Sequence, residues 1–273
     1  MMRPLSDWPL AARQNIIGVF TDIDDTLTTA GAITPDALQA LAQLKAAGLH
    51  VIPITGRPIG WSEQVAFGRA AGQGLSPAWP VDSVVAENGA AALMLSQADA
   101  SITKIYQQDV ATRMRNDARM QQVAARVVRE VSGAKLSKDS SGRETDIAID
   151  HSEFTQLSGE KQAQVIAIMQ SEGMNATVSS IHINGWFGDH NKLSGARWIV
   201  RQLFGRKLVS EMDRWVYVGD STNDALMFEH FAHSVGVANI RQFEAALSHK
   251  PRYVTPSERG AGFAEFAQVL LEK

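Results

Sequence analysis

The sequence predicts an α/β fold in which a parallel sheet carries an inserted α+β segment. A block at each end of the chain alternates short apolar runs with segments of helical periodicity, and the middle of the chain has a different pattern. Short apolar runs bounded by turn residues are typical of strands buried on both faces, as in a parallel sheet. Repeated strand–helix–strand units of this kind build a doubly wound sheet.

The N-terminal block contains one complete strand–helix–strand unit. A first strand is expected over residues 16–21 (IIGVFT). Thr34 followed by Pro35 is typical of an N-cap and the first helical position, and leucines spaced along the next residues give one apolar face before Gly48. A second strand is expected over residues 49–54, where the apolar run stops at the sequence TGRP.

The C-terminal block repeats this order of elements. A helix is expected from about Lys192, followed by a strand over residues 215–218 (WVYV) and a loop at Gly219-Asp220. A helix through Leu226 and Phe228 comes next, and the run SVGVA predicts one more short strand. The two blocks together predict a catalytic core made of residues 1–88 and 187–273.

The segment between the blocks, residues 89–186, is predicted to be a separate α+β insert. Strands are expected at AALML and TDIAID, and in the second of these Ile147 and Ile149 alternate with polar neighbours. Such alternation predicts a sheet with one solvated face. Helices are expected over about residues 109–131 and 158–172, each followed by glycine.

The composition favours a globular protein with a small, soluble ligand. A formal net charge of -3 gives no sustained basic surface, so neither nucleic acid nor an anionic membrane is expected as a partner. The absence of cysteine excludes disulfides and thiolate chemistry, and the sequence lacks an apolar run of membrane-spanning length. We expect a cytoplasmic protein, and no pattern in the sequence indicates an oligomeric state.

Two acids mark the end of the first predicted strand. Asp22 and Asp24 are two residues apart, so on an extended chain their carboxylates point to the same side. Ligands of open parallel sheets bind beyond the carboxyl ends of the strands, where this pair lies. Taken alone, the pair is equally compatible with an acidic turn.

Other polar residues are expected at the same edge of the sheet. Thr55 ends the second strand, Asp220 and Asp224 follow a later strand, and Lys192 begins the helix before it. A hydroxyl and backbone N–H groups at Thr55 could meet phosphate oxygens, while the carboxylates could hold a cation. An ammonium at Lys192 could neutralise a transferred phosphoryl group. Taken singly, each is better explained without a function: Thr55 as a helix cap, Asp220 and Asp224 as caps or solvated acids, and Lys192 as an ordinary surface lysine.

Taken together, FTDIDDTLT, PITGRP, Lys192 and VGDSTND resemble the four ordered motifs of the haloacid dehalogenase superfamily. This resemblance implies a Rossmann-like core. The insert between the second and third motifs, entered through VVAENGA, resembles the large cap of subfamily IIB. That subfamily includes sucrose-phosphate, trehalose-phosphate and mannosyl-phosphoglycerate phosphatases. The resemblance therefore implies a phosphatase acting on a small phosphorylated metabolite, with a sugar phosphate as the expected substrate.

The resemblance also implies a role for each motif residue. Asp22 would be the nucleophile, Asp24 the general acid and base, and Thr55 and Lys192 would hold the phosphoryl oxygens. Mg²⁺ would be bound by the carboxylates of Asp22 and Asp220 and by the main-chain carbonyl of Asp24, with Asp224 supporting either the metal or Lys192. Further residues expected to contact the substrate are Gly56, Arg57, Asn184, Trp186 and Asn223. One departure from the family pattern is Asp25, which stands where many relatives have glycine and could compete for the acid role.

Two stretches of the insert could add substrate contacts. His182, Asn184 and Trp186 alternate just before the third motif, so an extended chain would place them on one face. That face could bind a sugar, or Trp186 could simply pack a hinge. Arg143-Glu144 could likewise reach the substrate, although a solvated loop is the favoured interpretation.

Two other functions compete with the phosphatase interpretation. A phosphomutase of the same superfamily would return the phosphoryl group to another hydroxyl instead of releasing it to water. A receiver-type phosphoacceptor module also combines aspartates, threonine and lysine on an α/β sheet. An insert of about a hundred residues is not expected in such a module, so domain size argues against it.

Overall fold

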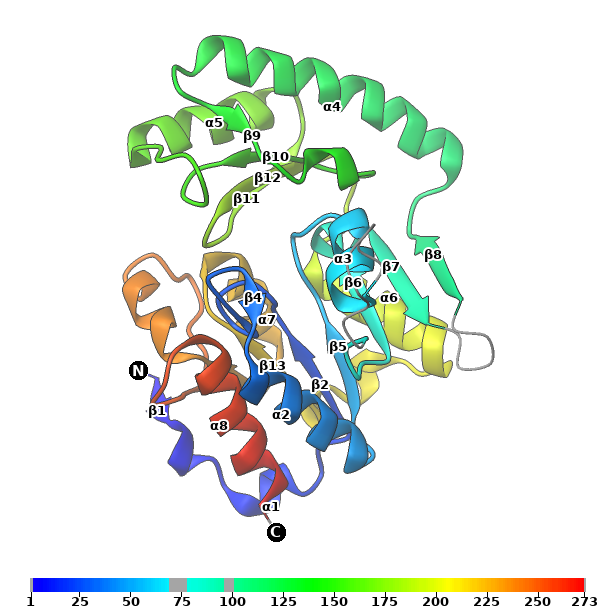
Figure 1. Cartoon of the computed structure of the whole chain (residues 1–273), viewed down its shortest axis with the longest axis vertical. Helices are drawn as coiled ribbons and strands as arrows, with labels where there is room; N and C mark the ends of the chain where they lie inside the picture. Colours follow the sequence, from blue (N-terminus) through cyan, green and yellow to red (C-terminus); the bar gives the residue numbers. More distant parts are fainter. Residues whose placement is uncertain (1, 69–77, 96–100, 273) are drawn as a thin grey trace.

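The computed structural model describes residues 2–68, 78–95 and 101–272. It has two parts, a larger core built on a parallel sheet and a smaller inserted part above it in Figure 1. Both chain termini lie in the core (Figure 1). Within the described residues, every helix is too short or too polar to cross a membrane.

The core sheet has six strands, and all hydrogen-bonded neighbours in it are parallel. In spatial order the strands are β1 (Arg3–Pro4), β15 (Tyr253–Val254), β14 (His233–Gly236), β13 (Trp215–Gly219), β2 (Gly18–Thr21) and β5 (His50–Pro53). Val19 of β2 pairs with Val216 on one side and Val51 on the other. The predicted parallel α/β core is confirmed.

Helices cover both faces of this sheet, which explains why its strands are continuously apolar. Val19 and Val51 point to the face covered by α2 (Pro35–Ala46), α3 (Ile59–Ala66) and α8 (Arg259–Leu271). Phe20 and Ile52 point to the opposite face, which is covered by α6 (Lys192–Phe204) and α7 (Ala225–His230).

A second sheet of three antiparallel strands extends the core. It consists of β6 (Ser83–Ala86), β7 (Ala91–Leu95) and β8 (Ile102–Tyr106), and Ile54 bridges to Val85. Ala91 and Leu93 belong to the hydrophobic cluster that contains the core strands. The insert was expected to start at residue 89, but this hairpin packs with the core. We therefore propose that the inserted part begins after Tyr106.

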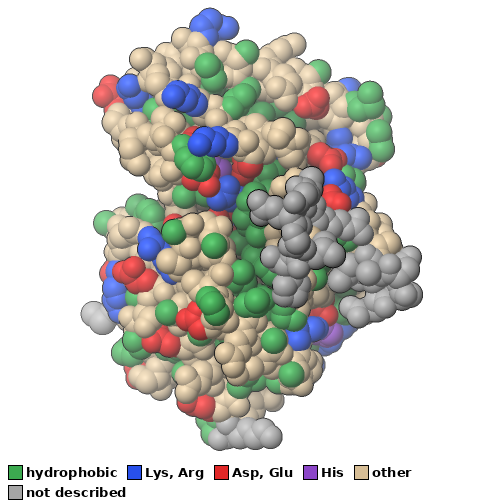
Figure 2. All heavy atoms as spheres, in the orientation of Figure 1, with side chains coloured by type: hydrophobic (Ala, Val, Ile, Leu, Met, Phe, Trp, Pro, Cys, Tyr) green, Lys and Arg blue, Asp and Glu red, His purple; other side chains and the backbone are tan. Residues whose placement is uncertain are grey.

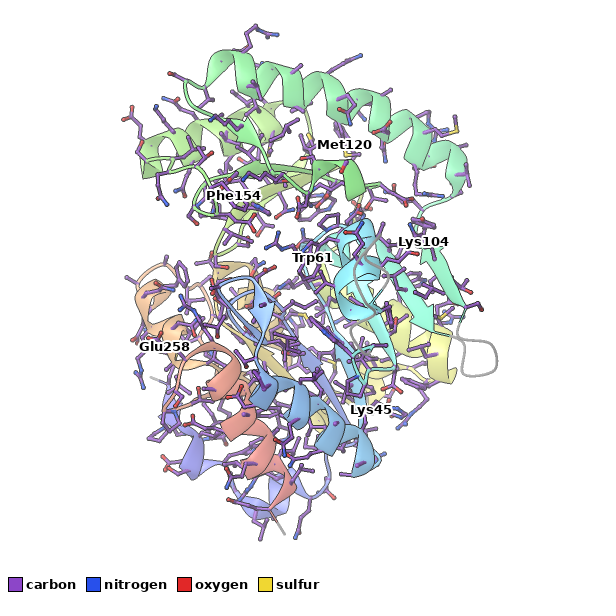
Figure 3. All side chains as sticks on the ribbon, in the orientation of Figure 1. Lys45, Trp61, Lys104, Met120, Phe154 and Glu258 are labelled. Atoms are coloured by element: carbon purple, nitrogen blue, oxygen red, sulfur yellow. The ribbon has the colours of Figure 1, made fainter. Side chains whose placement is uncertain are left out.

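The inserted part is an antiparallel sheet covered by two helices. Its strands, in spatial order, are β11 (Asn175–Val178), β12 (His182–Trp186), β10 (Ile147–Asp150) and β9 (Lys135–Leu136). The helices α4 (Val110–Glu130) and α5 (Gly159–Ser171) agree with the predicted ranges. Their apolar residues, among them Met120 (Figure 3), pack on the face of β10 that carries Ile147 and Ile149.

The other face of β10 is also buried, so the prediction of a solvated face is wrong. Asp146 and Asp150 are each no more than 3% exposed. Asp146 accepts hydrogen bonds from Arg143 at 2.7 Å and from Asn184 at 2.9 Å. Alternation correctly separates the polar from the apolar face, but the polar face is directed at the core instead of at water.

The remaining elements are short. They are α1 (Leu10–Arg13), β3 (Thr28–Thr29), β4 (Ala32–Ile33) and the 3₁₀ helices η1 (Leu5–Asp7), η2 (Glu87–Gly89), η3 (Ser140–Gly142), η4 (Leu208–Ser210), η5 (Met212–Arg214), η6 (Thr222–Asp224) and η7 (Ala238–Phe243). One of them positions the functional site, because η2 lies against α6. A Cβ atom on Gly195 of α6 would lie 2.6 Å from the Cα atom of Gly89, so this approach requires glycine.

Candidate active site

The carboxyl ends of β2, β5 and β13 meet the first turn of α6 at one edge of the core sheet. This arrangement brings together Asp22, Thr55, Asp220 and Lys192, as the sequence predicts. A small cavity of about 10 Å³ opens there. Its lining residues are Asp22, Asp24, Thr55, Gly56, Arg57, Ser179, Ile181, His182, Asn184 and Asn223.

Lys192 is buried and paired with two carboxylates. Its Nζ donates to Asp22 Oδ1 and to Asp224 Oδ1, both at 2.7 Å, and lies 3.4 Å from the Tyr217 hydroxyl. Burial alone would lower the pKa of Lys192, but the charges of Asp22 and Asp224 hold it above its ordinary value. The ammonium group therefore stays charged beside Asp22.

The acids around Lys192 carry more negative charge than one ammonium can balance. Burial raises the pKa of Asp22 to about 7, and the charges of Asp224 and Asp24 act in the same direction against Lys192. Burial also raises the pKa of Asp220 well above its ordinary value, helped by Asp22 and Asp224. A cation bound among these carboxylates would relieve the repulsion.

The same acids fit a divalent metal ion. Asp22, Asp220 and Asp224 each offer a carboxylate oxygen, and the three oxygens lie within 4.8 Å of one another. Oδ1 of Asp220 is buried and has no hydrogen-bond partner, while Oδ2 accepts from Asn239 at 3.2 Å. An orphaned oxygen in an all-oxygen donor set suits a hard cation such as Mg²⁺.

Asp224 is already engaged by protein groups. Its Oδ1 accepts from Lys192 and from the Tyr217 hydroxyl, and its Oδ2 accepts the backbone N–H groups of Asp220 and Ser221 at 2.9 and 3.1 Å. These contacts favour the interpretation in which Asp224 supports Lys192 and shapes the loop. Asp22 and Asp220 are left as the carboxylates with free ligand capacity.

Asp24 stands apart from this acid cluster. Its carboxylate accepts hydrogen bonds from Arg57 Nε at 3.0 and 3.1 Å and from Nη2 at 2.9 Å. The side chain faces the small cavity that Asp22 also lines. Asp24 is therefore placed to exchange protons with a group bound beside Asp22, once its contacts with Arg57 allow it.

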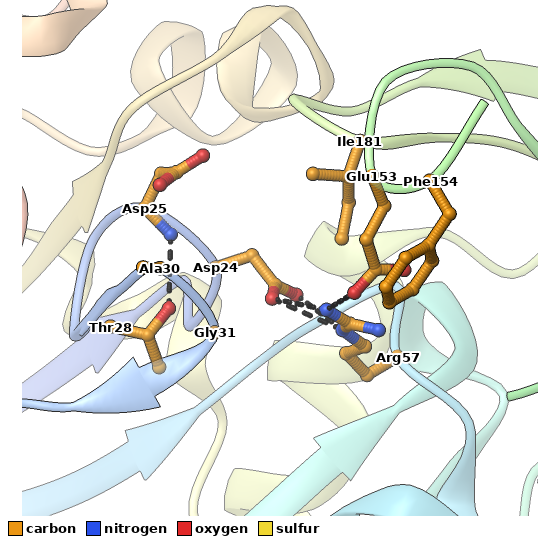
Figure 4. A pocket seen from close by; sticks show the side chains of 9 residues that line it. All are labelled: Asp24, Asp25, Thr28, Ala30, Gly31, Arg57, Glu153, Phe154 and Ile181. Atoms are coloured by element: carbon orange, nitrogen blue, oxygen red, sulfur yellow. Dashed lines mark hydrogen bonds and ion pairs between the residues drawn. The ribbon is translucent and has the colours of Figure 1, made fainter. Parts of the chain in front are cut away.

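Arg57 also contacts the inserted part. Its Nη1 donates to Asp139 at 3.0 Å, and its Nη2 donates to Glu153 at 2.8 Å. Figure 4 shows Asp24 and Glu153 approaching the guanidinium group from opposite sides. In Figure 2 acidic, basic and hydrophobic side chains meet at the constriction between the two parts of the molecule. One arginine thus joins the candidate proton donor to the inserted part.

Arg143 makes a second link between the two parts. Its side chain is 2% exposed, and its Nη1 donates to the Gly56 carbonyl oxygen at 3.0 Å and to Asp146 at 2.7 Å. The interpretation of Arg143-Glu144 as a solvated loop is wrong, because the neighbouring 3₁₀ helix η3 packs on α3 at Gly60. Trp61 of α3 lies at this boundary in Figure 3.

Of the residues predicted to bind substrate, Thr55, Gly56, Arg57, Asn184 and Asn223 line the small cavity, whereas Lys192 and Trp186 do not. The Thr55 hydroxyl accepts the backbone N–H of Arg57 at 3.0 Å, and Asn184 Nδ2 donates to the Gly56 carbonyl oxygen at 3.2 Å. Asn223 accepts from the Ser221 hydroxyl at 2.9 Å. His182, on the same face of β12 as Asn184, lies 2.8 Å from Glu153.

Trp186 occupies a different environment. Its indole N–H donates to the His190 carbonyl oxygen at 2.9 Å, and its ring stacks on the His190 ring. The side chain is 5% exposed and is not among the cavity-lining residues. The packed-hinge interpretation therefore explains Trp186 better than substrate stacking does.

Asp25 is held away from the acid cluster by its backbone and by a cation. Its φ of 55° lies in the left-handed region, where glycine is the usual residue and aspartate is tolerated. Its carboxylate lies 2.9 Å from Arg259 Nε. Asp25 therefore occupies a backbone conformation that glycine adopts more readily.

The sequence analysis missed several residues of this site. Tyr217 and Asn239 support Asp224 and Asp220, and Glu153 and Asp139 reach Arg57 from the inserted part. Asn239 could have been found, because it follows the strand β14 at the same carboxyl edge. Glu153 and Asp139 lie in irregular segments that no periodicity marks.

Comparison with known proteins identifies the family. The model of haloacid dehalogenase-like hydrolases matches residues 19–156. The chain belongs to the haloacid dehalogenase-like hydrolases. Membership in this family removes the receiver-type alternative. The chain has no match among curated proteins.

Several solved structures resemble this chain along most of its length. A protein from Thermoplasma acidophilum is 17% identical with a TM-score of 0.68, covering 93% of this chain and 98% of its own. The sucrose-phosphatase of Synechocystis, solved with sucrose and phosphate, is 15% identical with a TM-score of 0.61, covering 93% and 97%. A subclass IIB sugar phosphatase is 18% identical with a TM-score of 0.56, covering 88% and 93%. At these identities the likeness concerns the fold.

Proposed function

We propose that this haloacid dehalogenase-like hydrolase is a magnesium-dependent phosphatase that acts on a small sugar phosphate through an aspartyl-phosphate intermediate. The observation that carries the proposal is the set of groups around Asp22. Lys192 Nζ lies 2.7 Å from its carboxylate, and the unpaired oxygen of Asp220 belongs to the same acid cluster. Asp24 lines the same cavity as Asp22. This set supplies a nucleophile, positive charge, a cation site and a proton carrier.

The residues divide the reaction into two displacements at phosphorus. In the first, an Asp22 oxygen bonds to phosphorus, the bond from phosphorus to the ester oxygen breaks, and Asp24 gives that oxygen a proton. In the second, a water oxygen bonds to phosphorus and the bond to Asp22 breaks. Asp24 takes the water's proton, which restores both aspartates and releases inorganic phosphate.

Positive charge is needed because a phosphate monoester repels an incoming carboxylate. Lys192 supplies one such charge, and Thr55 and nearby backbone N–H groups would orient the phosphoryl oxygens. Mg²⁺ held by the carboxylates of Asp22 and Asp220 would supply the rest by polarising a phosphoryl oxygen. The main-chain carbonyl of Asp24 completes the proposed metal site, and Asp224 orients Lys192.

The two parts must separate before a substrate can enter. A cavity of about 10 Å³ has room for about one water molecule and not for a phosphoryl group. Separation would break the contacts of Arg57 with Asp139 and Glu153 and those of Asn184 and Arg143 with Gly56. The inserted part is therefore proposed to act as a cap that closes over bound substrate and excludes water.

A phosphate-release screen with added Mg²⁺ tests this function directly. Sugar phosphates and p-nitrophenyl phosphate would be compared, with Asp22→Asn as the matched inactive variant. Release by the native protein that is lost in the variant supports the proposal. Equal release by both would remove Asp22 from the mechanism, and an isomerised sugar phosphate without free phosphate would indicate a phosphomutase.

The roles of the β12 residues need a separate comparison. Asn184→Ala is expected to change the ranking of sugar phosphates relative to p-nitrophenyl phosphate, because Asn184 lines the cavity. Trp186→Ala is expected to lower stability without changing that ranking, because Trp186 packs the hinge. A changed ranking in the Trp186 variant would return this residue to the substrate site.

A further inference from the structure

A second cavity adjoins the candidate active site on the side of Asp24. It has a volume of about 400 Å³ and is lined by Asp24, Asp25, Thr28, Ala30, Gly31, Arg57, Glu153, Phe154 and Ile181. Asp24, Arg57 and Ile181 also line the small cavity beside Asp22, so the two cavities share these residues as a common wall. Because Asp24 lines both cavities, a group that leaves phosphorus on the Asp24 side would lie towards this space, whose lining residues Figure 4 shows. Its volume is in the range of small-molecule sites, about 300–1,000 Å³.

The charges in this cavity are unusual for an anion-binding enzyme. Its lining contributes the carboxylates of Asp24, Asp25 and Glu153, and Arg57 is the one cation among the described residues that line it. The guanidinium nitrogens of Arg57 are already bonded to Asp24, Glu153 and Asp139. No lining cation among the described residues is left to receive a second negative group.

Of two cations near the rim, Arg259 is paired with an acid, whereas Lys138 contacts an aromatic ring. Arg259 lies 2.9 Å from Asp25, and Lys138 lies 3.5 Å from the centre of the Phe154 ring. Lys138 also lines a neighbouring cavity, together with Asp139. A carboxylate or second phosphate inside the cavity would therefore face three lining carboxylates and one guanidinium group that already binds acids.

The same walls suit a ring that carries hydroxyl groups. The carboxylates of Asp25 and Glu153 can accept hydrogen bonds from hydroxyl groups, which are donors as well as acceptors. Phe154 is 60% exposed and lies at the boundary between the two parts in Figure 3, so its ring can cover the apolar face of a sugar. The opposite wall is the β3–β4 turn at Ala30 and Gly31, both with positive φ.

We infer that this cavity selects an uncharged, hydroxyl-bearing leaving group, so that the transferred phosphate is the only anionic group on the substrate. The inference rests on the proposed phosphatase function and narrows it. It favours monophosphates of neutral sugars and polyols, and it disfavours bisphosphates and phosphorylated sugar acids. Asp25 is the residue that most directly supports this inference. Its backbone conformation is one that glycine would adopt without a side chain, so the fold alone does not require the carboxylate.

Matched substrate pairs test the inference. Phosphate release with Mg²⁺ would be measured for glucose 6-phosphate against 6-phosphogluconate, and for fructose 6-phosphate against fructose 1,6-bisphosphate, with p-nitrophenyl phosphate alongside. The neutral member of each pair is expected to have the larger kcat/KM by at least about tenfold. Asp25→Asn should reduce this ratio severalfold, because asparagine tolerates the left-handed conformation and removes only the charge. Asp117→Asn, on the exposed side of α4, is the matched control and should leave the ratio unchanged.

The outcomes separate the inference from the proposed function. Release from p-nitrophenyl phosphate together with equal or better use of the anionic members would overturn the inference and leave the phosphatase function standing. Absence of release from every compound would instead contradict the phosphatase function. An unchanged ratio in Asp25→Asn would show that Asp25 does not set the selectivity.

Discussion

Arg57 of the core and Glu153 of the inserted part form an ion pair of 2.8 Å, and the same guanidinium group holds Asp24. The pair connects the position of the inserted part with the side chain proposed to carry protons. Glu153 also lies 2.8 Å from His182. If the cap opened, Arg57 would lose its contact with Glu153 and would hold Asp24 less firmly. Arg57 therefore links the closure of the cap to the orientation of the Asp24 side chain.

This pair predicts a loss of stability in acid. Burial alone would raise the pKa of Glu153, but hydrogen bonds from His182 and Arg57 lower it to about 2. Because the folded pKa lies below the unfolded value of 4.5, Glu153 stabilises the fold above that value. The contribution is lost as the pH falls from about 4.5 towards 2, and it is smaller than the full ~1.4 kcal/mol per pKa unit because solvent screens this partly exposed pair.

Urea unfolding between pH 5 and pH 2.5 measures this effect. The free energy of unfolding should fall less steeply in Glu153→Gln than in the native protein. Glu160→Gln, at an exposed position in the first turn of α5, is the control and should follow the native curve. Identical slopes in all three proteins would mean that Glu153 is not ion-paired in solution.

Asp22→Asn should lose at least about a thousandfold in kcat while remaining folded. The fold should tolerate the change because burial raises the pKa of Asp22 to about 7, so its charge is unfavourable where it lies. Lys192 keeps its contact with Asp224. Phosphate release and thermal unfolding of the variant check both parts, and activity near the native level would contradict the assignment of the nucleophile.

Mg²⁺ should raise the melting temperature as well as support activity. A ligand bound only to the folded state stabilises it by about 2.7 kcal/mol at a hundred times its Kd. Asp220→Asn should weaken this stabilisation, because the orphaned oxygen of Asp220 is a proposed ligand. Asp117→Asn serves as control.

Exhaustive EDTA treatment should abolish activity, and Ca²⁺ should inhibit because its looser shell can hold Asp22 in a geometry unsuited to attack. Full activity after EDTA would contradict the metal site.

The core of the site was predictable because strand ends in a parallel sheet share one edge. That rule located Asp22, Thr55 and Asp220 from short apolar runs alone. The same rule applies to Asn239, which was overlooked since an amide after SVGVA carries no motif. Sequence periodicity can therefore locate a site residue when that residue lies at the end of a predicted strand or helix.

Contacts made by docking two parts were not predictable in this way. Glu153 and Asp139 lie in irregular segments, and their positions beside Arg57 depend on how the inserted part sits on the core. The buried polar face of β10 has the same origin, because alternation reveals a polar face but not what covers it. The β7–β8 hairpin was assigned to the insert by its place in the sequence, whereas its pairing with β6 joins it to the core.

The close approach of Gly89 and Gly195 predicts a mutation that acts on Lys192 from a distance. Gly89 is the last residue of η2, and Gly195 lies on α6 three residues after Lys192. A Cβ atom on Gly195 would lie 2.6 Å from Gly89 Cα and 3.2 Å from its carbonyl oxygen. These contacts are with backbone atoms, which cannot relieve a clash by changing rotamer as a flexible side chain can. A Cβ atom at position 195 would therefore displace α6.

Gly195→Ala should therefore lower the free energy of unfolding by about 1–3 kcal/mol and reduce kcat, because the shift moves Lys192 relative to Asp22. Gly159→Ala is the matched control, since Gly159 is also helical and its added Cβ atom would meet nothing within 4 Å. That variant should be neutral or slightly stabilising. Urea unfolding and phosphate release would be measured for both variants. Native stability and activity in Gly195→Ala would show that α6 does not depend on this contact to position Lys192.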